Sequence, residues 1–142
     1  MRISDILRCK GHEVATILPD DSVRSFIDRL AELRIGALVV SSDGQRVGGI
    51  VSERDVVRGL HASGASLLDR PVSSIMTVEV HTCEPSASVD DLMRLMTDQR
   101  IRHVPVVQDG LLAGIVSIGD VVKRRMDELQ DERDQLEGYI RS

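Results

Sequence analysis

Two segments of the chain carry the same helical pattern of apolar positions, and Val89 stands 66 residues after Val23. Apolar residues at i, i+3, i+4 and i+7 are typical of an amphipathic helix that buries one face. The first segment places Val23, Phe26, Ile27 and Leu30 on this spacing, and the second places Val89, Leu92, Met93 and Met96. The pattern predicts two equivalent helices and an internal repeat.

A short run rich in β-branched residues follows each expected helix, over residues 36–40 and 102–107. Each run leads to an Asp-Gly pair, Asp43-Gly44 or Asp109-Gly110, which is a strong signal for a β-hairpin turn. The return strands are expected to begin at Gly49 and Gly114. These two glycines are 65 residues apart, whereas the two helices are 66 residues apart. The second copy is therefore one residue shorter before its return strand, which predicts a tighter second hairpin.

Short strands over residues 13–17 and 79–83 complete each copy, and a further helix is expected after Ser52 and after Ser117. The chain is therefore predicted to contain two β-α-β-β-α units, an α/β (α+β) architecture. One such unit is too small to cover its own sheet, so we expect the two copies to pack through their sheets with pseudo-two-fold symmetry.

The organisation expected along the chain is a first repeat with its leader over 1–65, a second repeat over 66–125, and a C-terminal helical extension over 126–142. Residues 3–7 and 72–76 form the two leaders, and residues 61–66 are expected to form the connecting loop. The last helix carries apolar residues at alternating spacings of four and three, interrupted by Arg133. They are Val122, Met126, Leu129, Leu136 and Ile140. Such a stripe needs a cover, either its own domain or a partner subunit, and we favour the partner.

The candidate chemistry lies in a repeated string, Gly-Ile-Val-Ser-x-x-Asp, over residues 49–55 and 114–120. Each string joins a strand to a helix, where backbone N–H groups and the helix dipole favour a phosphate. A carboxylate in the first helical turn can also accept hydrogen bonds from the two hydroxyls of a ribose. The alternative is that Ser-x-x-Asp only caps each helix and holds no ligand.

Bulk composition narrows the function classes. The chain of 142 residues is 42% hydrophobic and 29% charged, with a formal net charge of −5 and 1% aromatic residues. It has neither the basic footprint of a duplex-binding protein nor aromatic platforms for single strands, so we expect no nucleic acid partner. Its apolar runs are too short to span a bilayer, and the N-terminus resembles no secretory signal. Together with the isolated Cys9 and Cys83, these features predict a cytoplasmic protein with free thiols.

The paired units, the Arg-His-Val-Pro-Val-Val run at 102–107 and the two Ser-x-x-Asp strings resemble tandem CBS domains, the Bateman module. The resemblance covers nearly the whole chain, and the strings are similar to those of stand-alone bacterial members. This family often has Thr where the chain has Ser52 and Ser117, a change that preserves the hydroxyl.

The resemblance implies two clefts between the repeats, each able to hold an adenosine-containing ligand. It implies that Asp55 and Asp120 hold the ribose, that Ser52 and Ser117 help to seat ribose or phosphate, and that the backbone of the first strands meets the adenine. The other residues expected in the two sites are Ala15, Thr16, Gly36, Ala37, Val39, Ile50, Arg54, His81, Thr82, Arg102, His103, Val104, Pro105, Ile115 and Gly119. Because Gly36-Ala37 and Arg102-His103 differ between the copies, we expect two unequal sites.

The sequence therefore favours a regulatory module that binds AMP, ADP, ATP or NAD and has no catalytic cofactor. We expect a homodimer, joined through the two repeats and the C-terminal helix, that acts as a sensor of energy or redox state. No histidine or cysteine spacing is typical of a metal site, and we find no catalytic base, so we expect neither a metal nor an enzyme. The alternative is a ligand-independent dimeric scaffold. The regulated effector is not indicated.

Overall fold

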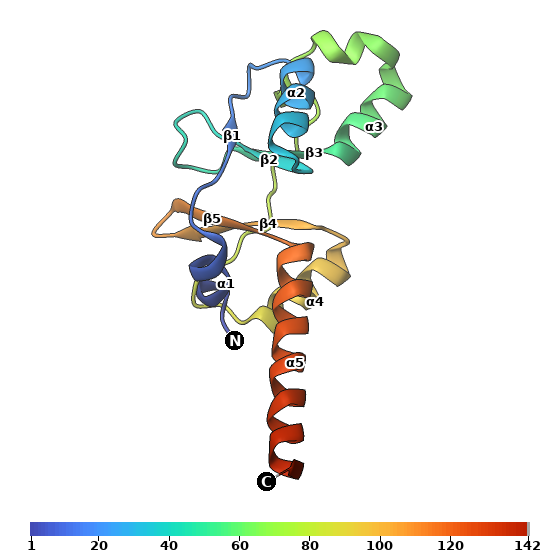
Figure 1. The fold of residues 1–142 in the computed structure, drawn as a ribbon. Coiled ribbons are helices and arrows are strands. Elements are labelled where there is room, and N and C mark those ends of the chain that lie inside the picture. Colours follow the sequence, from blue (N-terminus) through green and yellow to red (C-terminus); the bar gives the residue numbers. More distant parts are fainter. Residues whose placement is uncertain (142) are drawn as a thin grey trace.

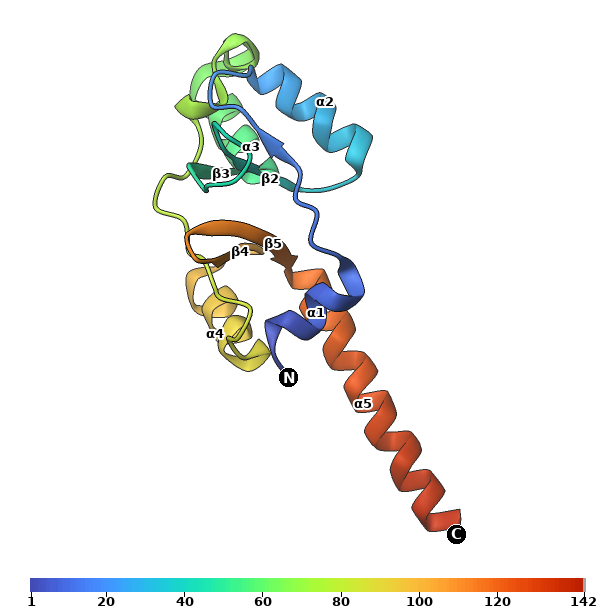
Figure 2. The ribbon, with the colours of Figure 1, turned by 90° about the vertical axis from the view of Figure 1, so that its left-hand side faces the viewer.

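The computed structural model describes residues 1–141 and contains two small sheets that face each other, each covered by helices on its outer side (Figures 1 and 2). The first repeat comprises β1 (Thr16–Ile17), α2 (Val23–Leu33), β2 (Ala37–Val40), β3 (Gly49–Ser52) and α3 (Glu53–Ser63). The second comprises α4 (Val89–Gln99), β4 (His103–Gln108), β5 (Leu111–Ser117) and α5 (Ile118–Arg141). The leaders form α1 (Ile3–Lys10) and the 3-10 helix η2 (Val72–Ser74), and η1 (Gly64–Asp69) precedes the latter.

The predicted helices are confirmed, and the hydroxyls of Ser22 and Ser88 cap α2 and α4 by accepting from backbone N–H groups three residues later. The loop expected over 61–66 is wrong. Helix α3 continues to Ser63 and runs into η1, because Leu67 packs against α3 at Gly59 and is fully buried there.

The first sheet has three strands, with β1 parallel to β2 and β2 antiparallel to β3, whereas β4 and β5 form an antiparallel pair. The strand predicted over 13–17 is shortened to β1. The strand predicted over 79–83 is wrong, because only Cys83 reaches the sheet, as a single parallel bridge to Val106. Its N–H donates to the Pro105 carbonyl and its carbonyl accepts from Val107.

The two hairpins differ more than their shared Asp-Gly pairs predict. Asp109 and Gly110 have φ values of 54° and 78°, both in the left-handed region, and they form the tight turn between β4 and β5. The hairpin predicted at Asp43-Gly44 is confirmed by the antiparallel pairing of β2 with β3, but its connection is longer. There the Asp43 carboxylate accepts from the N–H groups of Gln45 and Arg46 and holds an open loop over 41–48.

The leaders are exchanged between the repeats. Ile3, Ile6 and Leu7 of α1 are buried in the core of the second repeat, whereas Val72 of η2 lies in the core of the first. The contacts are close, since a Cβ added at Gly114 would lie 2.7 Å from Leu7 Cδ2. The spatial units thus differ from the sequential ones, and the exchange holds the two repeats together.

All four residues of β2 are buried, which shows that both faces of the first sheet are covered. Leu38 and Val40 belong to the core beneath the helices, while the alternate residues Ala37 and Val39 lie on the face toward the second sheet. A hydrogen bond from Leu112 N–H to the Gln45 carbonyl, 2.7 Å long, joins the two hairpins. The predicted fold class, with its C-terminal helix, is confirmed.

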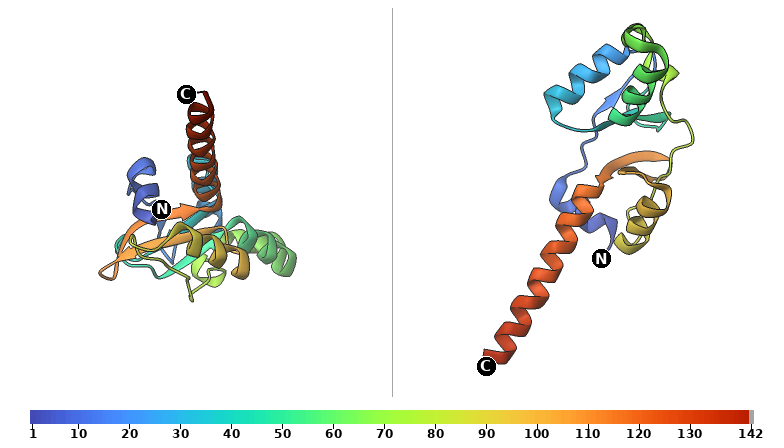
Figure 3. Two further views of the ribbon diagram at one scale, coloured as in Figure 1. Left: turned by 90° about the horizontal axis from the view of Figure 1, so that it is seen from below. Right: turned by 90° about the vertical axis from the view of Figure 1, so that its right-hand side faces the viewer.

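Helix α5 begins against α1 and α4 and then projects away from the rest of the molecule in every view (Figure 3). Val121 is its only fully buried residue among 118–141. Residue 142 of the predicted C-terminal extension lies outside the described residues.

Candidate functional site

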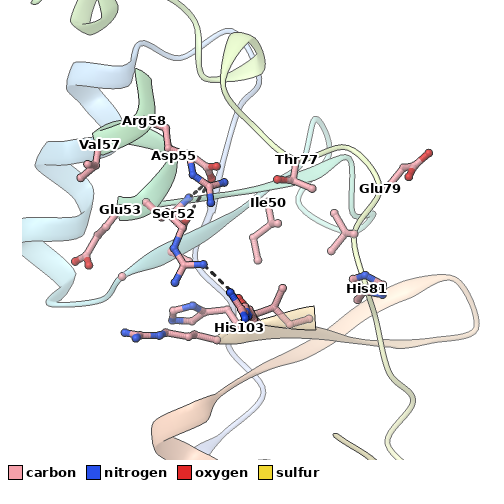
Figure 4. A pocket seen from close by; sticks show the side chains of 17 residues that line it. Ile50, Ser52, Glu53, Asp55, Val57, Arg58, Thr77, Glu79, His81 and His103 are labelled. Carbon is pink, nitrogen blue, oxygen red and sulfur yellow. Dashed lines mark hydrogen bonds between the residues drawn. The ribbon is translucent and has the colours of Figure 1, made fainter. Parts of the chain in front are cut away.

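A cleft of about 420 Å³ lies between the repeats, at the point where β3 ends and α3 begins (Figure 4). Its lining comes from the first repeat, from the connection after η2, and from the α4–β4 connection with the first residue of β4. Those residues are Gly36, Ala37, Ile50, Ser52, Glu53, Arg54, Asp55, Val57, Arg58, Thr77, Glu79, Val80, His81, Arg100, Ile101, Arg102 and His103. The volume falls within the usual range of small-molecule sites.

Asp55 stands in the first turn of α3, half-buried at the wall of the cleft. Its Oδ2 accepts from the Ser52 N–H at 2.8 Å and from the Ser52 hydroxyl at 3.2 Å. The string is therefore a helix cap, as the alternative interpretation holds, and it also lines a cleft. A cap that opens onto a cleft offers a fixed carboxylate and a helix N-terminus to a ligand.

Cations gather in this cleft although the chain as a whole carries a net charge of −5. Arg54 and Arg58 come from α3, and Arg100 and Arg102 come from the second repeat. They outnumber the carboxylates of the lining, Glu53, Asp55 and Glu79. Arg54 Nη1 also donates to the Arg100 carbonyl at 3.3 Å and links the two repeats across the cleft. The local charge favours an anionic ligand.

His103 lies at the first position of β4 with its ring near Gly36, where an added Cβ would be 3.5 Å from His103 Cε1. Burial lowers the pKa of His103, and the charges of Lys10 and Arg102 act in the same direction. Asp120 and Glu53 oppose them without reversing the shift. The imidazole is therefore held in its neutral form, beside both the cleft and the second string.

The second string has a different environment. Asp120 and Ser117 form a reciprocal cap, in which Asp120 Oδ2 accepts from the Ser117 N–H at 2.9 Å and the Ser117 hydroxyl accepts from the Asp120 N–H at 3.2 Å. The ammonium of Lys10 also reaches Asp120 Oδ2 at 2.6 Å and the Ile115 carbonyl at 2.8 Å. Burial raises the pKa of Asp120, but the bonds from Lys10 and Ser117 outweigh it and hold the pKa below its usual value.

The position of Lys10 follows from the unequal leaders. Leu7 packs against Gly114 just as Met76 packs against Gly49, so these two residues are equivalent. Thr77 follows Met76 directly and bridges Ile50, whereas α1 continues to Lys10 before the chain turns at Gly11. The longer first leader thus carries an ammonium to the carboxylate that is equivalent to Asp55.

Of the residues that the sequence suggested, the structure gathers a first group around the cleft: Gly36, Ala37, Ile50, Ser52, Arg54, Asp55, His81, Arg102 and His103. A second group lies outside it: Ala15, Thr16, Val39, Thr82, Val104, Pro105, Ile115, Ser117, Gly119 and Asp120. Val104 belongs to the core of the second repeat, and Val39 is fully buried. Gly36-Ala37 and Arg102-His103, which were expected to distinguish two sites, meet at one.

Sequence reasoning missed several lining residues, among them Arg58, Glu79 and Arg100. Arg58 could have been found, because it lies one helical turn after Asp55. Arg100 depends on the left-handed conformation (φ 54°) that ends α4, which no sequence signal at an arginine indicates.

Among residues 1–141, no group of three or more His, Cys, Asp or Glu side chains could hold a metal ion. No helix of this part of the chain is both long and apolar enough to cross a membrane. Burial raises the pKa of the Cys83 thiol to about 11, and this side chain packs against the core of the second repeat.

Comparisons with known proteins agree with this architecture. The model of the CBS domain matches residues 3–62 and 72–127. A mitochondrial CBS domain-containing protein of Arabidopsis thaliana is 38% identical over 97% of this chain and 71% of its own. The crystal structure of a CBS-domain-containing protein from Agrobacterium tumefaciens has a TM-score of 0.84 and 46% identity, over 87% of this chain and 92% of that one.

A third relative carries a ligand. The CBS domain protein of Pyrobaculum aerophilum, solved in complex with AMP, has a TM-score of 0.75 and 29% identity, over 84% of this chain and 89% of that one. Both repeats of the present chain match the same family model, and together the two matches cover most of its length. The chain therefore belongs to the CBS-domain family, as a tandem pair.

Proposed function

We propose that the protein is a regulatory module that binds an adenosine nucleotide in the cleft beside Asp55, with AMP, ADP, ATP or NAD as the candidate ligands. The observation that carries the proposal is one cleft in which the capped carboxylate of Asp55 meets arginines from both repeats. The relative from Pyrobaculum aerophilum solved with AMP supports an adenosine ligand.

The roles of the lining residues follow from their chemistry. Asp55 accepts hydrogen bonds from the ribose hydroxyls, and the N-terminus of α3 with Ser52 faces the phosphate. The arginines neutralise phosphate charge. Aromatic side chains are nearly absent, with only one Phe and one Tyr in the chain, so the base packs against aliphatic groups such as Ile50.

A ligand held between the repeats can report its presence by favouring one arrangement of them. Arg54 and Arg102 line the cleft from the two repeats, so we expect a ligand that contacts both to change their separation. The shift is limited to the difference in affinity of the ligand for the two arrangements. We propose that a homodimer transmits this shift as a sensor of energy or redox state, a regulatory role rather than an enzymatic one.

Isothermal titration calorimetry with adenosine, AMP, ADP, ATP and NAD tests the proposal. Heat with at least one phosphorylated ligand, and its loss in Asp55→Ala, is the expected result. Thermal melts of the variant separate loss of the site from loss of the α3 cap. Absence of heat with every adenosine compound would contradict the proposal.

A ligand-independent dimeric scaffold is the second candidate function, favoured by the exposed apolar stripe of α5. Leu129 and Leu136 are 53% and 63% exposed, which is unusual for two leucines on one helix face. This candidate predicts no change in melting temperature with any nucleotide, and loss of the dimer in Leu129→Asp. The cytoplasmic location and the absence of nucleic acid partners stay predictions.

A further inference from the structure

The exposed face of α5 has the period of a coiled-coil seam. Val122, Leu129 and Leu136 recur every seven residues, and Met126, Arg133 and Ile140 recur every seven residues between them. The apolar members are 46% to 81% exposed. A stripe that follows the core of its own domain has a period of 3.6, whereas 3.5 is the period of helices that pair along their length. Within residues 1–141, the projecting part of α5 runs away from the two sheets (Figure 2).

We propose that this seam, defined as Val122, Met126, Leu129, Arg133, Leu136 and Ile140, pairs antiparallel with the same seam of a second copy of the chain. The proposal rests on the homodimer within the proposed function but not on any nucleotide. It specifies which surface joins the two copies and in which direction the helices run.

The antiparallel register that uses all six seam residues is centred on Asp131. It pairs Met126 with the partner's Leu136 and Val122 with the partner's Ile140. Arg133 then lies level with the partner's Leu129, so that its aliphatic stem covers a leucine while its charged end stays at the surface, bonded to Glu137 of its own helix at 3.2 Å.

The start of the seam also fits this register. Ile118, Val122 and Met126 form an open apolar surface near the start of α5, with Lys123 and Asp127 beside it. The partner's Ile140, at the far end of its helix, lies beside Val122 and covers part of this surface. Ile140 is 81% exposed in the single chain, so its burial there removes a large apolar area from water.

Charges beside the seam favour the antiparallel direction. In a parallel pair Arg133 would face the partner's Arg133, and Glu132 would lie beside the partner's Glu137, so like charges would meet on both flanks. In the antiparallel register Lys123 lies beside the partner's Glu137, twice by symmetry. Its one unfavourable contact is Glu132 with the partner's Glu132, at the centre.

Disulfide cross-linking of the full chain tests both pairing and direction, in a Cys9→Ser, Cys83→Ala background that removes the native thiols. The expected result is efficient cross-linking only when Met126→Cys and Leu136→Cys proteins are mixed, because these positions face each other across the antiparallel seam. The two controls are Met126→Cys alone and Leu136→Cys alone. Each would cross-link with itself in a parallel pair, and that result would overturn the proposal. A lack of cross-linking in the mixture and in both controls would overturn it as well.

Charge reversal gives an independent measurement by analytical ultracentrifugation. Lys123→Glu places a glutamate beside the partner's Glu137, so we expect the dissociation constant of the dimer to rise about tenfold. The double variant Lys123→Glu/Glu137→Lys is expected to restore the original dissociation constant. In a parallel pair the single reversal would have little effect, because Lys123 has no charged neighbour there. Nucleotide binding measured on the same proteins keeps the outcomes distinct, since the cleft can bind a ligand whether or not the helices pair.

Discussion

The two Ser-x-x-Asp strings have the same local structure and different surroundings, and this difference shows what a repeated motif can and cannot determine. Each string ends a strand, caps a helix and fixes an aspartate in the first helical turn. Asp55 opens onto a cleft with four arginines in its lining, whereas Asp120 is bonded to Lys10 of the exchanged leader. The local motif fixes the position of the carboxylate, and residues far away in the sequence determine which groups lie next to it.

The largest expected effect separates the two aspartates. Asp55→Ala removes the acceptor for two ribose hydroxyls, and hydrogen bonds to a charged group contribute about 1.5–3 kcal/mol each. We expect the nucleotide affinity of the cleft to fall about 100-fold, on the scale of tenfold for each ~1.4 kcal/mol. Asp120→Ala is the matched control, since it removes the equivalent cap. Calorimetry measures the nucleotide affinity of both variants. An equal loss of affinity in the two would contradict the assignment of the binding site to Asp55.

The sequence predicts the repeat well because the burial of one helix face imposes a period that can be read directly. It also locates Asp55 and Ser52, since a strand followed by a capping pair is a local feature. The exchange of leaders is not visible in the sequence. The two leaders, Ile3-Ile6-Leu7 and Val72-Ile75-Met76, have the same apolar spacing, so the spacing alone does not indicate which core each one joins.

The inequality of two sites stays a prediction, but the residue pairs that suggest it lie together in the structure. Arg102 and His103 differ from Gly36 and Ala37, yet all four line one cleft, because the first turn of α3 faces the start of β4 across the repeats. The residue that separates the two strings is Lys10, which lies 110 residues before Asp120 in sequence. Long-range contacts of this kind have no signature in the spacing of a single sequence.

Removing the lysine should make the second string more like the first. In Lys10→Met, Asp120 loses the ammonium that occupies its Oδ2, and we expect a second nucleotide to bind per chain, with affinity at that site increased about tenfold. The fold should lose about 1 kcal/mol or less, because the pair is partly exposed at 34% and 24%.

Arg8→Met is the control for Lys10→Met, since the exposed Arg8 lies on the same helix and pairs with Asp5 at 3.5 Å. Calorimetric stoichiometry measures the outcome. An unchanged value of one nucleotide per chain in Lys10→Met would show that Lys10 is not what keeps the second string from binding.

The helix ends before β2 and β4 provide a more subtle test. Arg34 and Arg100 end α2 and α4 in the same left-handed conformation, with φ values of 55° and 54°, but only Arg100 lines the cleft. Asparagine tolerates this conformation, so Arg34→Asn and Arg100→Asn are matched variants. We expect Arg100→Asn to weaken ATP binding about fivefold with little effect on adenosine, and Arg34→Asn to change neither. Similar effects of the two variants would contradict the role of Arg100 in neutralising the phosphate.

The smallest expected effect concerns pH and His103. Burial lowers the pKa of His103, so the empty protein keeps the ring neutral, and the stability that this provides is present above pH ~6.5 and is lost as the pH falls through the lowered pKa. A bound phosphate favours the protonated ring, so we expect ATP affinity to increase about threefold between pH 8 and pH 6. His103→Gln should abolish this increase, whereas His81→Gln, on the facing connection of the same cleft, should retain it. Affinities measured at both pH values provide the test, and an equal dependence in the two variants would assign the proton to another group.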